Sequence, residues 1–200
     1  MSGFVSRLVD LVGAIVGLLV LSPVMAIIAV AIKRDSNGPV IFTQERVGRR
    51  GRPFTLFKFR TMTHGPVEGP TVTASGDARV TRVGARLRST KLDELPQLIN
   101  VAKGEMSLVG PRPEVRRYVD LWTVEQRHVI LSVRPGITDP MTVQLRREEA
   151  LLGAQSDPEV YYAEYLVPEK AEGYMDYIRC RTIAGDLKIL LETVVAVLRA

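Results

Sequence analysis

An apolar segment at residues 11–32 constrains this chain more than any other stretch. It contains no charged residue and consists mainly of Leu, Val, Ile and Ala. At about 1.5 Å of rise per residue, a straight helix of this length would cross a hydrocarbon layer of roughly 30 Å. Ser22 and Pro23 stand in its middle, where a proline removes a backbone donor and clashes with the preceding turn. The segment therefore predicts a membrane-associated helix that is broken at Ser22-Pro23.

The charges that flank this segment are mixed at both ends, so neither end dominates under the positive-inside rule. They are Arg7 and Asp10 before it, and Lys33, Arg34 and Asp35 after it. Each half of a broken helix would have about 12 residues and a length of roughly 18 Å, which is too short to cross alone. We expect residues 1–35 to re-enter the bilayer from one face, with a kinked single span as the alternative. Residues 36–200 would then form a cytoplasmic domain.

Positive charge is concentrated in the first part of the chain. Residues 1–113 carry 16 Lys and Arg against 8 Asp and Glu, whereas residues 114–200 carry 11 against 14. Such a basic half points to phosphate-bearing partners: nucleic acid, anionic lipids or phosphorylated small molecules. The basic half adjoins the apolar segment and contains no recognised nucleic-acid module, so we do not expect nucleic-acid binding.

Two stretches that are rich in β-branched and aromatic residues follow the apolar segment, at residues 39–44 and 53–59. A basic turn at residues 47–52 joins them, which predicts a small β-hairpin. Helical spacing of apolar residues begins beyond the hairpin. It covers residues 80–87, 95–102, 114–131 and 183–198. We therefore expect an α+β fold that is mostly helical.

The last of these segments, residues 183–198, is amphipathic. Its apolar positions are Ile183, Leu187, Leu190, Leu191, Val194 and Leu198. The pattern fits an interfacial helix on the membrane surface, and packing within the domain is the alternative.

Asp93 and Glu94 form an acidic pair in surroundings that are otherwise basic. The flanking cations are Arg79, Arg82, Arg86, Arg88, Lys91, Lys103 and Arg112. The pair precedes the helical pattern of residues 95–102, and at a helix start both carboxylates can face one ligand. Acidic residues at helix starts are also common caps, so the local pattern leaves a cap and a ligand site as alternatives.

A metal at this pair would be one that prefers oxygen ligands. His64 and His128 are far apart in the sequence and Cys180 is the sole cysteine, so no His/Cys zinc cluster is evident. Mg²⁺ is favoured at Asp93 and Glu94, with Mn²⁺ as the alternative.

Arg112 stands between Pro111 and Pro113. Each proline fixes its own φ and disfavours helix in the residue before it, so Arg112 is held in an extended backbone. A preorganised guanidinium suits the binding of a phosphate through paired donors.

Taken together, these motifs resemble the bacterial sugar transferases known as monotopic phosphoglycosyl transferases, in their minimal, catalytic-domain form. The resemblance extends in the family's order over nearly the whole chain. The matching stretches are Ser22-Pro23, Gly38-Pro39-Val40, Gln44-Glu45-Arg46-Val47-Gly48, Lys58-Phe59-Arg60-Thr61-Met62, Leu92-Asp93-Glu94-Leu95-Pro96-Gln97, Ser107-Leu108-Val109-Gly110-Pro111-Arg112-Pro113 and Val133-Arg134-Pro135-Gly136-Ile137-Thr138. Many larger relatives continue with a Gly-Trp-Ala-Gln run, which residues 139–142 replace here.

The resemblance implies transfer of a phosphosugar from a UDP-sugar to a polyprenyl phosphate such as undecaprenyl phosphate. This is the first membrane step of glycoconjugate assembly, at the cytoplasmic face of the bacterial inner membrane. The family's chemistry implies that Asp93 attacks the β-phosphorus, releases UMP and carries the phosphosugar covalently. Asp93 and Glu94 would face Mg²⁺, and Arg112 would bind phosphate. Further substrate-binding candidates are Lys58, Arg60 and Asp157.

Two other interpretations remain open. A non-catalytic, basic scaffold protein on the membrane surface would use Asp93 and Glu94 only as a helix cap. A metal-dependent transferase could also use the same residues without forming a covalent intermediate. Asp157 is also a candidate helix cap, and the oligomeric state is open, a homo-oligomer included.

Overall fold

The computed structural model describes residues 3–65, 72–139, 141, 145 and 148–198. Within them the protein is mostly helical, with one antiparallel β-hairpin and a short parallel strand pair. The α+β prediction is confirmed.

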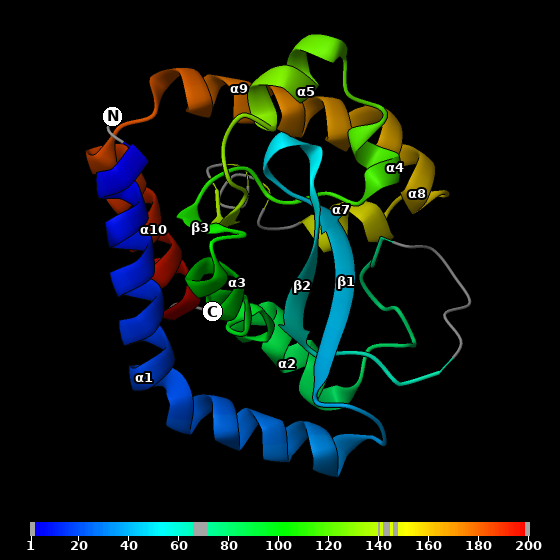
Figure 1. The fold of residues 1–200 in the computed structure, drawn as a ribbon. Coiled ribbons are helices and arrows are strands. Elements are labelled where there is room, and N and C mark those ends of the chain that lie inside the picture. The colour runs from blue at the N-terminus through cyan, green and yellow to red at the C-terminus, as the bar shows by residue number, and fades with distance from the viewer. Residues whose placement is uncertain (1–2, 66–71, 140, 142–144, 146–147, 199–200) are drawn as a thin grey trace.

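The apolar segment forms helix α1 (Gly3–Asp35), which is helical through Pro23. Figure 1 shows α1 as two arms that meet at a bend, one along the side of the molecule and one across its base. Ser22 Oγ donates a 2.9 Å hydrogen bond to Leu19 O, so the serine hydroxyl stays within the helix. The predicted break thus takes the form of a bend within one continuous helix, because one proline removes only one helical hydrogen bond.

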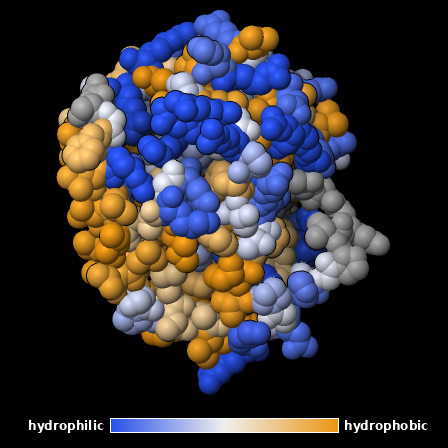
Figure 2. Space-filling model, in the orientation of Figure 1, coloured by the Kyte–Doolittle hydropathy of each residue, from blue (hydrophilic) through white to orange (hydrophobic). Residues whose placement is uncertain are grey.

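By length and composition, α1 is the one helix in the described part of the chain that could cross a membrane. Only 11% of its most apolar 18-residue window is buried within the protein. Large apolar side chains such as Leu19 and Ile27, each 70% exposed, cover its free surface. Figure 2 shows apolar surface on the side where Figure 1 places α1 and α10 (Ile183–Leu198).

Small residues let the first arm of α1 pack closely against the domain. Ala14 is fully buried, and a Cβ added to Gly13 would come within 2.7 Å of Leu108. A Cβ on Gly17 would lie 3.1 Å from Leu98. Because Gly13, Ala14 and Gly17 share one helical face, that face can approach helix α3 (Gln97–Lys103) and strand β3 (Ser107–Val109).

The predicted hairpin is confirmed. Strands β1 (Ile41–Val47) and β2 (Pro53–Phe59) pair antiparallel from Ile41 with Phe59 to Val47 with Pro53. The connecting turn is the short 3₁₀ segment η1 (Arg49–Gly51), in which Arg50 has a φ of 61°. Arg50 N donates to Leu131 O at 2.8 Å, so the turn is fastened to the domain.

Short helices follow the hairpin. Helix α2 (Arg82–Ser89), close to its predicted position, is capped by Thr81, whose side chain accepts from Gly84 N. The 3₁₀ turn η2 (Leu92–Glu94) leads through Leu95 and Pro96 into α3. Strand β3 then pairs in parallel with β4 (Gly136–Thr138).

The predicted helical segment at residues 114–131 is two short helices, α4 (Arg116–Val119) and α5 (Val124–Ile130). The prediction of one segment is wrong because Thr123 starts a new helix. Its side chain accepts from Gln126 N, and the Gln126 side chain accepts from Thr123 N, which is a capping box.

The C-terminal part of the chain covers the domain. Its elements are α7 (Glu148–Gly153), α8 (Pro158–Tyr161), the π-helical turn η3 (Tyr162–Leu166), α9 (Val167–Cys180) and α10. The largest core cluster lies under α9 and includes Trp122, Leu166 and Tyr174. The predicted helix at residues 183–198 has the bounds of α10, and its Ile183, Leu187 and Leu191 are exposed.

Candidate active site

The acidic pair lies in the turn η2, immediately after Lys91, whose φ of 56° is left-handed. Asp93 is 6% exposed and Glu94 is 7% exposed. The N-cap residues are Lys91 for η2 and Pro96 for α3, and neither makes a side-chain cap. The cap interpretation of the pair is therefore wrong, and two buried carboxylates stand next to each other without a capping role.

Glu94 is held by two cations from distant parts of the chain. Lys58 Nζ on β2 lies 3.0 Å from Glu94 Oε1. Arg112 donates from Nη1 to Glu94 Oε2 at 3.2 Å, and from Nη2 to Oε1. Burial alone would raise the pKa of Glu94, but the charges of Arg112 and Lys58 outweigh it and hold the pKa well below its usual range. Glu94 is therefore an ionised anchor for both cations.

Asp93 has the opposite environment. Its Oδ1 is buried and has no hydrogen-bond partner among the described residues. Burial and the neighbouring charge of Glu94 raise the pKa of Asp93. The structure thus separates the two carboxylates: Glu94 is held by ion pairs, whereas Asp93 has a buried oxygen without a partner among the described residues.

The extended segment that carries Arg112 is fixed from two sides. Gly110 packs against the segment that leads into β4: a Cβ added to Gly110 would come within 2.6 Å of Arg134 O. Arg46 Nη1 on β1 donates to Pro113 O at 3.0 Å, and Val47 N donates to Glu114 O at 2.9 Å. The predicted preorganisation of Arg112 is therefore supplied by tertiary contacts as well as by its two prolines.

Two candidates are not part of this cluster. Arg60 is 5% exposed and donates to Asn37 O at 2.9 Å and Ser36 O at 2.7 Å, so it ties the end of α1 to the end of β2. Asp157 caps α8, since its Oδ1 accepts from Glu159 N and Val160 N at 3.0 Å each. The structure brings together Asp93, Glu94, Lys58 and Arg112.

Comparison with known proteins identifies the family. The family described as bacterial sugar transferase matches residues 1–200. The chain belongs to the bacterial sugar transferase family. The resemblance inferred from the motifs is thus confirmed.

Three relatives within the bacterial sugar transferase family illustrate the match. The UDP-glucose:undecaprenyl-phosphate glucose-1-phosphate transferase of Caulobacter vibrioides is 38% identical over 196 residues, covering 96% of this chain and 69% of that protein. The transferase of the same name from Klebsiella pneumoniae is 38% identical over 94% of this chain and 39% of that protein. The UDP-N-acetylgalactosamine-undecaprenyl-phosphate N-acetylgalactosaminephosphotransferase of Aeromonas hydrophila is 45% identical over 68% of this chain, and the aligned part spans one third (33%) of that protein.

Arg46, which contacts the segment that carries Arg112, was not among the site residues predicted from the sequence. Its guanidinium donates to Pro113 O, pairs with Glu114 Oε2 at 3.5 Å and contacts Gln44 Oε1. The available signal was its place in the Gln44–Gly48 motif of the family. Of the stretch that departs from the larger relatives, Asp139 is 1% exposed, whereas Pro140 and Thr142 lie outside the described residues.

The donor set at the acidic pair fits Mg²⁺ in part. The described part of the chain contains no group of three or more His, Cys, Asp or Glu side chains that could hold a metal. Mg²⁺ sites commonly use one or two carboxylates together with substrate phosphates. Asp93 Oδ1 is a buried oxygen without a partner, while both Glu94 oxygens already accept from cations. Asp93 is therefore the better ligand of the two.

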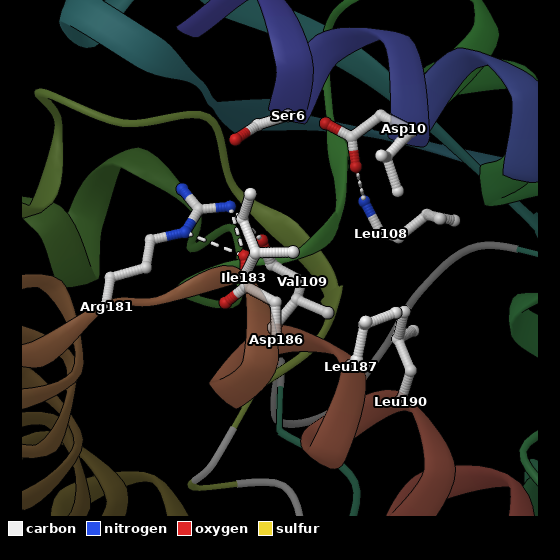
Figure 3. A pocket seen from close by; sticks show the side chains of 10 residues that line it. Ser6, Asp10, Leu108, Val109, Arg181, Ile183, Asp186, Leu187 and Leu190 are labelled. Carbon is white, nitrogen blue, oxygen red and sulfur yellow. Dashed lines mark hydrogen bonds and ion pairs between the residues drawn. The ribbon is translucent and has the colours of Figure 1, made fainter. Parts of the chain in front are cut away.

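A cavity lies between the first arm of α1, strand β3 and the start of α10 (Figure 3). Asp10 Oδ1 accepts a 2.9 Å hydrogen bond from Leu108 N. Arg181 pairs with Asp186 Oδ2 at 2.9 Å and donates to Val109 O at 3.3 Å. These contacts fasten α1 and α10 to the strand that leads into the Pro-Arg-Pro segment.

Proposed function

We propose that this protein is a phosphoglycosyl transferase that moves a phosphosugar from a UDP-sugar to undecaprenyl phosphate, releasing UMP. The named activities of the Caulobacter, Klebsiella and Aeromonas relatives support this reaction class. The observation that carries the proposal is the contrast between Asp93, with an unpaired buried oxygen, and Glu94, paired with Lys58 and Arg112.

The reaction has two displacement steps at phosphorus. In the first, an Asp93 carboxylate oxygen bonds to the β-phosphorus of the donor, and the bond from that phosphorus to the bridging oxygen breaks. UMP leaves with the bonding electrons, and the phosphosugar stays on Asp93. In the second, a phosphate oxygen of the lipid attacks the same phosphorus and the Asp93 carboxylate leaves. Polyprenyl diphosphosugar is the product.

The cationic side chains lower the repulsion between an anionic nucleophile and a diphosphate. Arg112 has five donors, so it can contact a phosphate oxygen while it still pairs with Glu94. Lys58 adds a second positive charge at the same carboxylate. Glu94 acts by holding both cations beside Asp93. Mg²⁺ bound through Asp93 and the donor phosphates would neutralise further negative charge during transfer.

Helix α1 would place this site where the lipid phosphate lies. A bent apolar helix suits insertion from the cytoplasmic face of the bacterial inner membrane, with the domain at the headgroup plane. Anchoring both the enzyme and the acceptor in one surface raises the effective concentration of the acceptor. The products would then enter glycoconjugate assembly.

The test is UMP release by the purified protein with Mg²⁺, undecaprenyl phosphate and a panel of UDP-sugars. We expect release with at least one donor, and mass spectrometry after donor alone should find a phosphosugar on Asp93. Asp93→Asn should remain folded and give neither signal. If no donor yields UMP, the proposal fails. UMP release without an adduct would favour direct transfer, and full function of Asp93→Asn would favour the scaffold interpretation.

A further inference from the structure

Two polar atoms without partners lie within one turn of the chain at the acidic pair. Asp93 Oδ1 is an acceptor and Gln97 Nε2 is a donor, and both are buried and unpaired among residues 3–65, 72–139, 141, 145 and 148–198. The Gln97 side chain is 1% exposed. Most buried donors and acceptors in folded proteins have a hydrogen-bond partner, so two such atoms in one turn are unusual.

The backbone places Gln97 on the side of the acidic pair. From Leu92 to Lys103 the chain is right-handed helical, because Leu95 and Pro96 between η2 and α3 also have helical dihedral angles. Gln97 follows Asp93 by four residues and Glu94 by three. Side chains at these spacings are neighbours on a helical surface, and a glutamine amide can hydrogen-bond a carboxylate at this spacing.

Both Glu94 oxygens already accept from Arg112, and Oε1 also accepts from Lys58, so Glu94 has less unmet hydrogen-bonding capacity than Asp93. Asp93 Oδ1 is the nearby acceptor that lacks a donor. One hydrogen bond between Asp93 and Gln97 would satisfy both buried atoms at once.

We propose that Gln97 is a positioning residue: a rotation of its side chain lets the amide donate to Asp93, and this contact orients the carboxylate for attack. The inference rests on the proposed function of Asp93. With Asp93 Oδ1 held by Gln97, Oδ2 is the oxygen directed at the β-phosphorus. Gln97 acts through Asp93 and does not bind the donor itself.

The kinetic test compares Gln97→Leu with the wild-type protein in single turnovers of UDP-N-acetylgalactosamine and UDP-glucose. We expect the rate of UMP release to fall about tenfold or more, while the dissociation constant of the donor changes less than about twofold. Gln155→Leu is the matched control, because Gln155 lies just beyond α7, away from the acidic pair in the sequence, and its Nε2 donates to Leu151 O. It should release UMP at the wild-type rate.

A second measurement does not depend on activity. In a double-mutant cycle of Asp93→Ala and Gln97→Leu, the Tm shift of the double variant should differ from the sum of the single shifts by about 2 °C or more. Gln97→Met, with an unbranched side chain, replaces Gln97→Leu if the latter impairs folding.

Three results would overturn the role of Gln97: additive Tm shifts, an unchanged rate of UMP release, or a rate that falls only as donor binding weakens. The last would make Gln97 a donor-binding residue. A wild-type protein that releases no UMP with any donor but shows the coupling would instead reject the proposed function and retain the Asp93–Gln97 contact.

Discussion

Lys58 Nζ lies 3.0 Å from Glu94 Oε1, joining the β-hairpin to the turn that carries the acidic pair. Burial lowers the pKa of Lys58, and the charge of Glu94 opposes that effect. Both groups are mostly buried, so the charge of each offsets the desolvation cost of the other. The contact also explains why Asp93 is unpaired, because the nearest cations from β2 and from the Pro-Arg-Pro segment are directed to Glu94.

Replacing Lys58 with Met should destabilise the protein. The change leaves Glu94 with Arg112 alone in a buried setting, and loss of a hydrogen bond to a charged group costs about 1.5–3 kcal/mol. Urea unfolding of the purified protein would measure the difference. Lys103→Met is the matched control, since Lys103 pairs with Glu105 at 2.8 Å but is 47% exposed. A cost for Lys103→Met as large as that for Lys58→Met would contradict the assigned importance of the buried pair.

Asp93→Asn should abolish transfer and at the same time stabilise the fold. The amide carries no charge to desolvate and no repulsion from Glu94, so we expect the free energy of unfolding to rise by about 1 kcal/mol. A helix cap would give the opposite sign, because loss of a cap lowers stability. Thermal unfolding of the wild-type and Asp93→Asn proteins at pH 7 distinguishes a buried, uncompensated charge from a helix cap. Asp120→Asn, at an exposed carboxylate, is the control and should change little.

The stability difference between the wild-type protein and Asp93→Asn should depend on pH. The pKa of Asp93 is raised in the folded state above the ordinary 3.8, so folded Asp93 keeps its proton where the unfolded chain has lost it. The destabilisation that ionised Asp93 causes is therefore absent below pH 3.8, and it grows as the pH rises through the pKa of Asp93 in the folded protein. Folded Glu94 stays ionised over this pH range, because Arg112 and Lys58 hold its pKa well below its usual range. Equal differences in Tm at pH 3.5 and pH 7 would refute this account.

Much of the site could be predicted from local sequence, because its parts are local. The hairpin follows from two β-rich stretches around a basic turn, and the extended Arg112 follows from Pro111 and Pro113. The contacts of Asp93 and Glu94, in contrast, depend on tertiary structure. Lys58 meets Glu94 across 36 residues of sequence, and no periodicity encodes which of two adjacent carboxylates a distant strand will approach.

Arg60 illustrates the same limit. Strand alternation would place Lys58 and Arg60 on one face, but β2 ends at Phe59, so the alternation stops before Arg60. The Arg60 guanidinium instead reaches the backbone at Ser36 and Asn37. A sequence motif that contains both residues does not distinguish a substrate contact from a structural one.

Arg60→Met should therefore reduce stability rather than donor binding. It removes a buried guanidinium that satisfies two carbonyls, and we expect a loss of about 2–3 kcal/mol. Gly38→Ala tests the same contact from the other side, since Gly38 has a φ of +121° and a Cβ there would lie 2.1 Å from Arg60 Nη1. Both variants should lower Tm. A raised donor dissociation constant in folded Arg60→Met, without a change in Tm, would instead support phosphate binding.

The last prediction concerns Asp10, through which the first arm of α1 supports the site. Its Oδ1 accepts from Leu108 N at 2.9 Å, and it is 6% exposed. Asp10→Ala leaves the Leu108 N–H buried without a partner, at a cost of about 1–3 kcal/mol. Because β3 continues into the segment of Arg112, we also expect slower UMP release. Asp10→Asn retains a side-chain oxygen acceptor and should restore most of both losses. If Asp10→Asn is as impaired as Asp10→Ala, the negative charge of Asp10 matters more than its hydrogen bond, and the support of β3 by α1 would need another explanation.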